Sequence, residues 1–228
     1  WIRLRIFNDP KAENGYSKKG YCDLQHTVAM AKRIKAAGMG FLLNFHYSDS
    51  WADPAKQVKP KAWVNLNFTE LKKTLFDYTF DVISALKNAG VEPEWVQIGN
   101  EITPGLLLPE GDSGKNFPQL VELLNSGYEA VKKASPNSKV ILHVDQGNNN
   151  ARFRWWFDEA KKNNAKYDII GMSYYPYWLE GKPDYTTNIE DLAFNLNDMV
   201  RRYGKEVMVV EVGGEDDKRV EGHRELLA

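Results

Sequence analysis

The chain has 228 residues, of which 43% are hydrophobic and 27% are charged, and its formal net charge is −1. This composition predicts one domain over residues 1–228 with a sizeable core, and it contains no apolar run near the roughly 20 residues that span a bilayer and no signal-like start. Nucleic acid is excluded as an expected partner, because phosphate neutralisation requires a basic patch that this chain lacks.

Short apolar runs of strand length alternate along the chain with longer segments of helical spacing. In chain order, strands are predicted at 1–7, 39–46, 94–99, 139–144, 168–174 and 206–211, with helices at 23–37, 69–89, 117–134, 152–163 and 189–203 between them. Gly38, Gly90 and Gly204 follow three of these helices and are typical helix stops. This alternation predicts an α/β fold with a parallel sheet and outer helices, and the mostly apolar strands fit burial on both faces.

Six strands are too few for an eight-stranded barrel, and an open sheet would leave its edges unprotected. The chain starts within a predicted strand and ends within a predicted helix near Glu225. We therefore expect a (β/α)8 TIM barrel that is incomplete at both ends over 1–228, with one strand before the chain and another after it. No Pro/Gly/Ser-rich linker divides the sequence.

Two glutamates close two of the predicted strands. Glu101 ends the run WVQIGNE (95–101), and Glu211 ends the run VMVVE (207–211). Because the C-terminal strand ends of such a barrel converge on one mouth, these distant carboxylates are predicted to face each other. Two carboxylates that face each other across a sugar bond are the catalytic groups of a glycosidase.

Polar and aromatic residues follow the other predicted strands. They occur at residues 5–10, 46–54, 143–146 and 173–178. Aromatic rings suit the apolar faces of sugars, while Asn, Asp and His suit sugar hydroxyls, so the combination favours a carbohydrate ligand. Trp51 and Trp178 are expected to be sugar platforms because both fall in loops at the mouth.

Five segments carry a resemblance to a known family. Residues 3–10 (RLRIFNDP), 46–54 (HYSDSWADP), 61–63 (KAW), 99–101 (GNE) and 173–176 (SYYP) resemble those of the microbial endo-β-1,4-galactanases in order and spacing. The resemblance implies a retaining enzyme of the clan of (β/α)8 glycosidases, with its acid/base after strand 4 and its nucleophile after strand 7. If the chain covers strands 2 to 7, these positions fall on Glu101 and Glu211.

The resemblance also implies a substrate and a set of residue roles. The substrate would be β-1,4-linked galactan of pectic type I arabinogalactan, with Glu211 as nucleophile and Glu101 as acid/base. Arg5 and Tyr174 would contact Glu211, and Arg3 and Tyr175 are the alternatives in a neighbouring register. Asn100 would bind the sugar 2-hydroxyl, and His143 would orient the acid/base or a hydroxyl. The expected substrate-binding or supporting residues are Arg5, His46, Asp49, Trp51, Asn100, His143, Tyr174 and Trp178.

Several of these side chains also have a purely structural interpretation. A glutamate at a strand end is often an ion-pair partner or a helix cap. His46 and His143 are also compatible with hydrogen-bonded core histidines. Asp49 and Asp53 are also suited to capping backbone N–H groups of their own loop.

No metal and no cofactor is expected to be required. Histidines and aspartates cluster near the strand ends, but no His-x-His or His-Glu-x-x-His spacing occurs, and the single cysteine, Cys22, excludes an internal disulfide. Some bacterial members of the resembled family hold a structural calcium after strand 7. Here Glu211 is followed by VGGEDD (212–217), which departs from that pattern and is equally suited to a solvated helix start, so calcium is left open.

Two rival functions remain from the sequence. Another enzyme of the clan, such as a mannanase, cellulase or xylanase, would share both glutamates, but the segment 46–54 argues against it. A non-catalytic glycan-binding barrel would lose one carboxylate, whereas this chain has both. Because polymeric pectin cannot enter a cell, we expect an extracytoplasmic protein, and we expect it to be a monomer.

Overall fold

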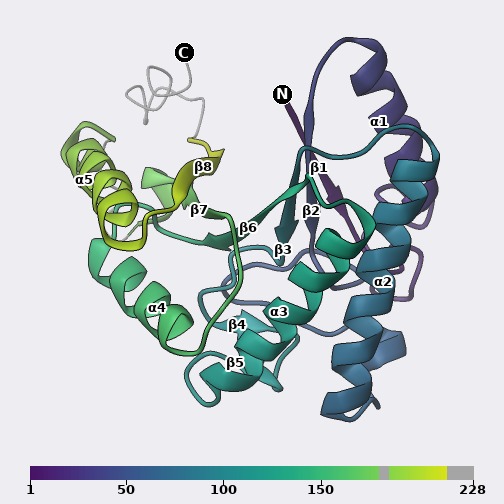
Figure 1. Ribbon diagram of the computed structural model, residues 1–228, viewed down its shortest axis with the longest axis horizontal. Helices are drawn as coiled ribbons and strands as arrows, with labels where there is room; N and C mark the ends of the chain where they lie inside the picture. Colours follow the sequence, from purple (N-terminus) through teal and green to yellow (C-terminus); the bar gives the residue numbers. More distant parts are fainter. Residues whose placement is uncertain (180–184, 215–228) are drawn as a thin grey trace.

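The chain folds as a curved parallel sheet with its helices on the outside (Figure 1). The structure is a computed structural model that describes residues 1–179 and 185–214. The six strands, in the order in which they lie in the sheet, are β1 (Ile2–Ile6), β2 (Phe41–Phe45), β3 (Trp95–Ile98), β6 (Lys139–Val144), β7 (Ile169–Tyr174) and β8 (Glu206–Val212). The helices of the described chain are α1 (Leu24–Ala36), α2 (Phe68–Asn88), α3 (Phe117–Ala134), α4 (Asn150–Lys162) and α5 (Tyr185–Tyr203).

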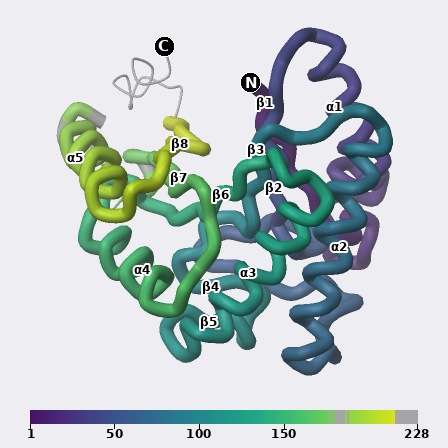
Figure 2. Tube along the Cα trace, in the orientation of Figure 1, coloured from purple at the N-terminus to yellow at the C-terminus, as the bar shows by residue number. Residues whose placement is uncertain are grey.

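The predicted alternation and the parallel sheet are confirmed. In Figure 2 the sheet curls as part of a barrel, with β1 and β8 at its two edges. The sequence did not predict the short antiparallel pair β4 (Gly105–Leu106) and β5 (Gly111–Asp112), because two-residue strands leave no period to detect. The predicted helix near Glu225 lies outside the described residues.

The helices begin at side-chain caps that the sequence supplies. The Asp23 carboxylate accepts a hydrogen bond from the His26 backbone N–H at 2.8 Å and starts α1. Asn67 and Glu70 form a reciprocal capping box at the start of α2. Among the described residues, none of the helices combines the length and the apolar character that crossing a membrane requires.

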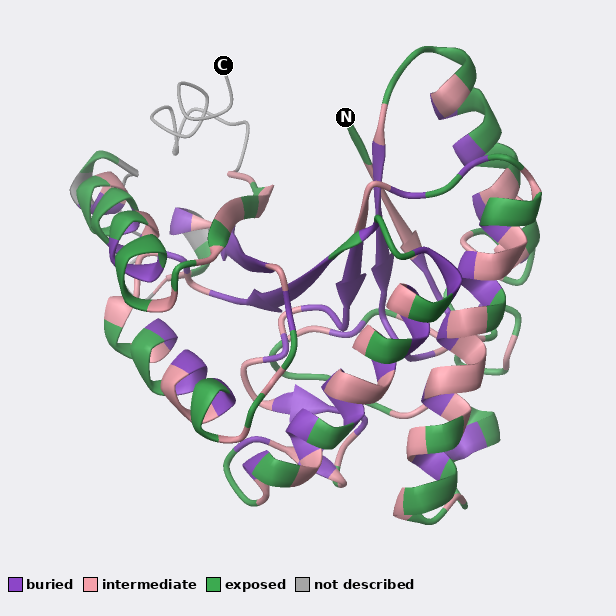
Figure 3. Cartoon of the chain, in the orientation of Figure 1, coloured by how far each residue is buried: buried purple, intermediate pink, exposed green. Residues whose placement is uncertain are grey.

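The two faces of the sheet have different roles. On the outer face, alternate residues such as Leu43, Val96 and Leu142 pack against the helices in the large core, which Figure 3 shows as buried. On the inner face, a smaller apolar cluster around Leu42 and Ile141 lies at the N-terminal part of the strands. The inner positions nearer the C-terminal ends are polar, and they build the site described below.

A charged group stabilises the contact between α4 and α5. The Asp198 carboxylate accepts hydrogen bonds from Arg154 Nε and Nη2, both at 2.8 Å, and from Asn150 Nδ2 at 2.8 Å. Asp198→Ala is expected to lower the free energy of unfolding by about 2–3 kcal/mol, because it leaves partly buried donors without their charged acceptor. Denaturant unfolding of the full-length protein measures this loss.

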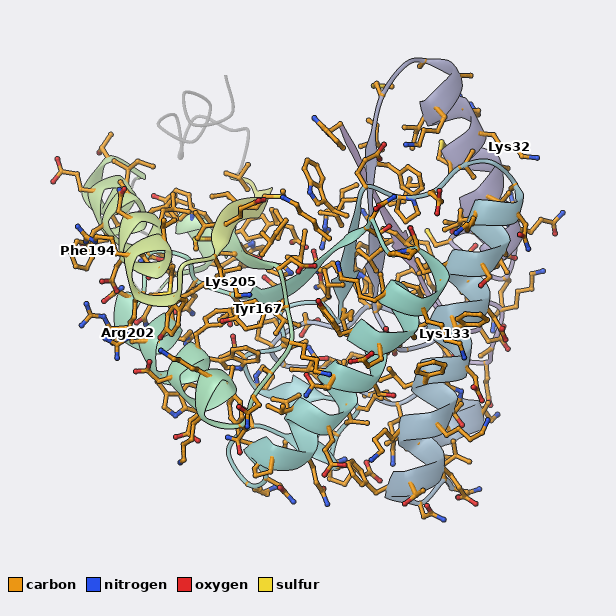
Figure 4. All side chains as sticks on the ribbon, in the orientation of Figure 1. Lys32, Lys133, Tyr167, Phe194, Arg202 and Lys205 are labelled. Atoms are coloured by element: carbon orange, nitrogen blue, oxygen red, sulfur yellow. The ribbon has the colours of Figure 1, made fainter. Side chains whose placement is uncertain are left out.

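The matched control lies between the same two helices. Asp158 pairs with Arg202 at 2.7 Å, with both side chains more than 40% exposed, and Figure 4 shows Arg202 at the outer surface of α5. Asp158 also accepts from Arg202 Nε at 3.1 Å and from the Tyr203 hydroxyl at 2.9 Å, but solvent competes for these bonds. Asp158→Ala is therefore expected to cost less than Asp198→Ala, about 1 kcal/mol. Equal losses in the two variants would contradict the importance assigned to Asp198.

The contribution of Asp198 also has a defined pH dependence. Hydrogen bonds from Arg154 and Asn150 hold the pKa of Asp198 below its ordinary value. A lowered folded-state pKa stabilises the fold above the unfolded pKa of about 4, and this stabilisation is lost as the pH falls through the folded pKa. The difference between wild type and Asp198→Ala is therefore expected to be constant from about pH 5 to 8 and to shrink in stronger acid.

Candidate active site

A pocket of about 730 Å³ opens at the C-terminal ends of the strands. Both glutamates singled out from the sequence line it, together with three other predicted site residues. The main lining residues are Trp51, Asn100, Glu101, Tyr175, Trp178 and Glu211. The structure therefore brings together carboxylates that are distant in sequence, as the strand pattern predicts.

Glu101 follows β3 in a tight left-handed turn. Gly99 has a φ of 80° and Glu101 a φ of 48°, a region that is costly for a residue with a side chain. A Cβ on Gly99 would lie 2.5 Å from Ile102, so glycine is required there for space as well as for conformation. The buried Gln57 amide donates to the carbonyls of Asn100 at 2.8 Å and Glu101 at 3.2 Å, and these bonds hold the turn in place.

The environment of Glu101 favours its protonated form. Burial raises the pKa of Glu101 to about 7, and the negative charges of Glu211, Asp145 and Asp53 act in the same direction. The Ser173 hydroxyl donates to Glu101 Oε1 at 2.6 Å and opposes this rise. A carboxyl with a pKa near neutrality is suited to general acid and base catalysis.

Glu211 has a different environment, in which two donors hold its oxygens. Arg3 Nη2 lies 2.7 Å from Oε1 in an ion pair, and the Tyr175 hydroxyl donates to Oε2 at 2.8 Å. Gly213 leaves room for the Tyr175 ring, since a Cβ there would lie 2.7 Å from it. One carboxyl is therefore desolvated and the other is paired with a cation.

A β-bulge sets the direction of Glu211. Met208 pairs with Gly171, Val209 with Met172, and Glu211 with Ser173, so the register shifts by one residue on β8. Strict alternation from the inward-facing Met208 would place position 211 on the outer face. The extra residue returns Glu211 to the inner face, level with Ser173.

The predicted contacts of Arg5 and Tyr174 with Glu211 are wrong. Arg3 makes the ion pair, while the Arg5 guanidinium lies 4.2 Å from the centre of the Trp51 ring. Both arginines are on the inner face, but a two-residue step moves a side chain by about 6.6 Å along a strand. Tyr174 ends β7 on the outer face, where its hydroxyl donates to Asn188, and the next residue, Tyr175, reaches Glu211.

The two histidines are buried behind the pocket. His46 Nδ1 accepts from the Ala52 N–H at 3.0 Å, and burial lowers the pKa of His46 to about 3. His143 is fully buried, which lowers its pKa well below the ordinary value, and its Nε2 lies 2.6 Å from Ser173 Oγ. His143 therefore reaches the Glu101 carboxyl through Ser173 rather than directly.

Asp49 is engaged in loop structure and does not line the pocket. Its carboxylate accepts from the backbone N–H groups of Asp9 at 3.0 Å and Lys61 at 2.8 Å, which joins the segments after β1 and β2. Asp53 caps its own loop through Ala55 N–H at 2.8 Å and also lines the pocket. The structural interpretation of both aspartates is therefore observed.

Asn100 and the two tryptophans line the pocket. The Asn100 amide oxygen accepts from Arg3 Nη2 at 2.8 Å and from Asn44 Nδ2 at 3.0 Å, while its nitrogen donates to the Ala52 carbonyl at 2.8 Å. These bonds fix the amide at the pocket wall. Trp51 is 42% exposed and Trp178 is 75% exposed, so both rings offer apolar surface.

Sequence reasoning missed two buried glutamines that support the site, Gln57 and Gln97. Gln97 contacts Arg3, His143 and the Gly99 carbonyl. The sequence does contain a signal for it, because Gln97 is the polar residue within an otherwise apolar strand. Gln57 lies in a loop, where a polar residue gives no such signal.

The described residues contain no group of three or more His, Cys, Asp or Glu side chains that could hold a metal ion. The acidic residues 215–217, on which the question of calcium depends, lie outside the described residues. Besides Glu101 and Glu211 with their donors, the pocket is lined by Asp53, Asp145 and aromatic rings. These groups are suited to acid/base and nucleophilic chemistry on a sugar.

Known proteins share this sequence and fold. The chain is 43% identical over 217 residues to the Niallia circulans protein called "Uncharacterized protein in bgaB 5'region", with 92% of this chain and 56% of that one covered. It is 35% identical over 216 residues to the arabinogalactan endo-β-1,4-galactanase of Thermothelomyces thermophilus, with 92% and 61% covered. The Ignisphaera aggregans GH53 catalytic domain superposes with a TM-score of 0.84 at 35% identity, covering all of this chain and 63% of that one.

The chain thus spans about three-fifths of the length of these relatives. Their shared fold confirms the predicted (β/α)8 class. The family profile described as glycosyl hydrolase family 53 matches residues 1–223. On this match over nearly its whole length, the chain belongs to glycosyl hydrolase family 53.

Proposed function

We propose that the protein carrying this chain is a retaining endo-β-1,4-galactanase that cleaves the galactan of pectic type I arabinogalactan. The observation that carries the proposal is the contrast between two carboxyls in one pocket. Glu101 is desolvated, with its pKa raised to about 7, whereas Glu211 is ion-paired with Arg3. Retaining glycosidases require such a pair, one group protonated and the other ionised.

In the first step, a carboxylate oxygen of Glu211 attacks the anomeric carbon. The bond from that carbon to the leaving oxygen breaks, and Glu101 donates its proton to the oxygen. In the second step, the now ionised Glu101 takes a proton from water, and the oxygen of this water attacks the anomeric carbon. Glu211 is released as a carboxylate and Glu101 regains its proton, with no metal or organic cofactor taking part.

The other residues of the pocket have supporting roles in this proposal. Asn100 is fixed by Arg3 and Asn44 and is placed to bind the sugar 2-hydroxyl, a contact that strengthens in the transition state. Trp51 and Trp178 supply exposed rings for neighbouring sugars. A relative named arabinogalactan endo-β-1,4-galactanase supports galactan, instead of mannan, xylan or cellulose, as the proposed polymer.

Product release from linear β-1,4-galactan by the full-length protein tests the function, with mannan, xylan and cellulose as comparison substrates. Galacto-oligosaccharides that first appear in the β configuration by proton NMR would support both the substrate and the retaining mechanism. Hydrolysis of another glycan but not of galactan would indicate an enzyme of the same clan with a different substrate. Tight galactan binding without hydrolysis would favour a binding protein instead.

The corrected tyrosine assignment gives a separate prediction. Tyr175→Phe removes the hydroxyl that donates to Glu211 Oε2 at 2.8 Å and is expected to lower kcat by about 10- to 100-fold. Tyr174→Phe is the matched control, because that hydroxyl faces Asn188 on the outer side of the sheet. Steady-state kinetics on galactan distinguish them, and a larger loss in Tyr174→Phe would contradict the assignment.

The substrate also determines where the protein works. Polymeric galactan does not enter cells, so we infer an extracytoplasmic location. We propose separately that the enzyme is a monomer. Fractionation of the source cells, with activity assayed in each fraction, and the molar mass of the full-length protein in solution test these two points.

A further inference from the structure

The supports of the two carboxyls meet at one buried side chain, Gln97. Its Oε1 accepts from Arg3 Nη2 at 3.2 Å, and Arg3 pairs with Glu211. Its Nε2 lies 2.9 Å from His143 Nδ1, and His143 is linked through Ser173 to Glu101. Gln97 is fully buried on the inner face of β3, so solvent does not compete for these bonds.

The orientation of the Gln97 amide follows from the chemistry of its neighbours. The Arg3 guanidinium has only donors, so the Gln97 oxygen must face it. The amide nitrogen then donates to the Gly99 carbonyl at 2.9 Å and to His143 Nδ1 at 2.9 Å. Reversing the amide would place N–H groups against Arg3 and leave the Gly99 carbonyl without its donor.

This orientation fixes the tautomer of His143. Its Nδ1 receives the Gln97 amide and also the backbone N–H of Glu101 at 3.3 Å, so Nδ1 must be the acceptor. A neutral imidazole then carries its proton on Nε2 and donates it to Ser173 Oγ at 2.6 Å. The single hydroxyl hydrogen of Ser173 is thereby directed to Glu101 Oε1 at 2.6 Å.

We propose that Gln97 is the positioning residue for both carboxyls: its nitrogen sets the tautomer of His143 and hence the hydroxyl donation to Glu101, and its oxygen anchors Arg3 beside Glu211. The proposal rests on the function given above for the catalytic step. Its structural part, the direction of the hydrogen-bond chain, is independent of activity. Gln97 does not line the pocket and acts only through its neighbours, which also include Asn100 Oδ1 at 3.4 Å from its nitrogen.

The charges around Glu101 decide how the hydrogen bonds from Gln97 through His143 and Ser173 are expected to affect the pKa of Glu101. Glu211 from β8, Asp145 after β6 and Asp53 after β2 all favour the neutral acid, while Ser173 from β7 favours the carboxylate. Of these groups, the Ser173 hydroxyl opposes the rise in the pKa of Glu101. Losing its donation raises the pKa of Glu101, and the protonated acid then persists to higher pH.

The first test measures the ring nitrogens of His143 by NMR in the full-length protein labelled with ¹⁵N-histidine. His143→Gln assigns the signals by their loss. We expect wild-type His143 to be neutral with its proton on Nε2. A proton on Nδ1, or a charged ring at neutral pH, would overturn the proposal whether or not galactan is hydrolysed.

The second test uses Gln97→Glu to reverse the direction of the hydrogen bonds that run from residue 97 through His143 to Ser173. A carboxylate at position 97 accepts from His143 Nδ1, so the proton moves from Nε2 and Ser173 turns its hydroxyl to Nε2. Gln25→Glu adds the same charge at an exposed position of α1 and is the matched control. An unchanged His143 spectrum in folded Gln97→Glu would overturn the proposal.

Ser173→Ala serves as the second variant if Gln97→Glu does not fold. It removes the hydroxyl but leaves Gln97 in place, so His143 should keep its proton on Nε2. In Ser173→Ala, which adds no charge, the basic limb of the kcat/KM profile on galactan is expected to move up by about one pH unit, because Glu101 loses its donor. In Gln97→Glu the added negative charge acts in the same direction as the loss of the donor. A purely structural role would lower activity without moving this limb, so an unmoved limb would contradict the proposal.

Discussion

Glu211→Ala is expected to lower kcat on linear β-1,4-galactan by about 10⁴-fold or more, because it removes the proposed nucleophile, which would split the reaction into two steps. Arg3 and Tyr175 would remain, but the carboxylate that they hold would be absent. Hydrolysis rates at saturating galactan measure the loss. Circular dichroism confirms that the variant is folded.

Azide gives a test that separates loss of the nucleophile from general damage. With the carboxylate removed, azide has room to attack the anomeric carbon from the same side and is expected to give an α-galactosyl azide. Glu206→Ala is the matched control on the same strand, since Glu206 pairs with Lys139 at the opposite end of β8 and is exposed. Full activity of Glu211→Ala without azide would exclude its assigned role.

Glu101→Gln is expected to lower kcat/KM on galactan by about 10³-fold, the range for losing a general acid. The loss should be much smaller for an aryl galactoside with a good leaving group, because that group departs without a proton. Kinetics on the two substrates measure the contrast. The basic limb of the wild-type pH profile is expected near pH 7, because the pKa of Glu101 is raised to about 7 and only its protonated form donates.

The control for this prediction is Glu92→Gln. Glu92 lies before β3 and pairs with Lys87 at 3.6 Å, with its side chain 45% exposed. Glu92→Gln removes the same charge outside the pocket, so the kinetics of this variant should remain those of the wild type. Equal losses on galactan and on the aryl substrate in Glu101→Gln would show that Glu101 is not the acid.

The strand ends were predictable from sequence because apolar runs end at visible polar residues. The spacing of the apolar strands was sufficient to place Glu101, Asn100 and Trp51 at the C-terminal end of the barrel. The sequence could not decide between the two candidate tyrosine partners of Glu211, because one residue of register separates Tyr174 from Tyr175 and reverses the face of the sheet.

The bulge on β8 illustrates the same limit. It places Glu211 opposite Ser173, and no residue type around position 210 signals it. Backbone capping by Asp49 was foreseen as an alternative, but its partners, the N–H groups of Asp9 and Lys61, were not. Gln97 does carry a sequence signal, because it is a polar residue within an otherwise apolar strand.

The ion pair between Arg3 and Glu211 has a structural consequence. Arg3 lies on β1 and Glu211 on β8, the two strands at opposite edges of the curved sheet. The pair therefore crosses the inside of the curve instead of joining neighbouring strands, and its 2.7 Å distance depends on the placement of every strand between β1 and β8.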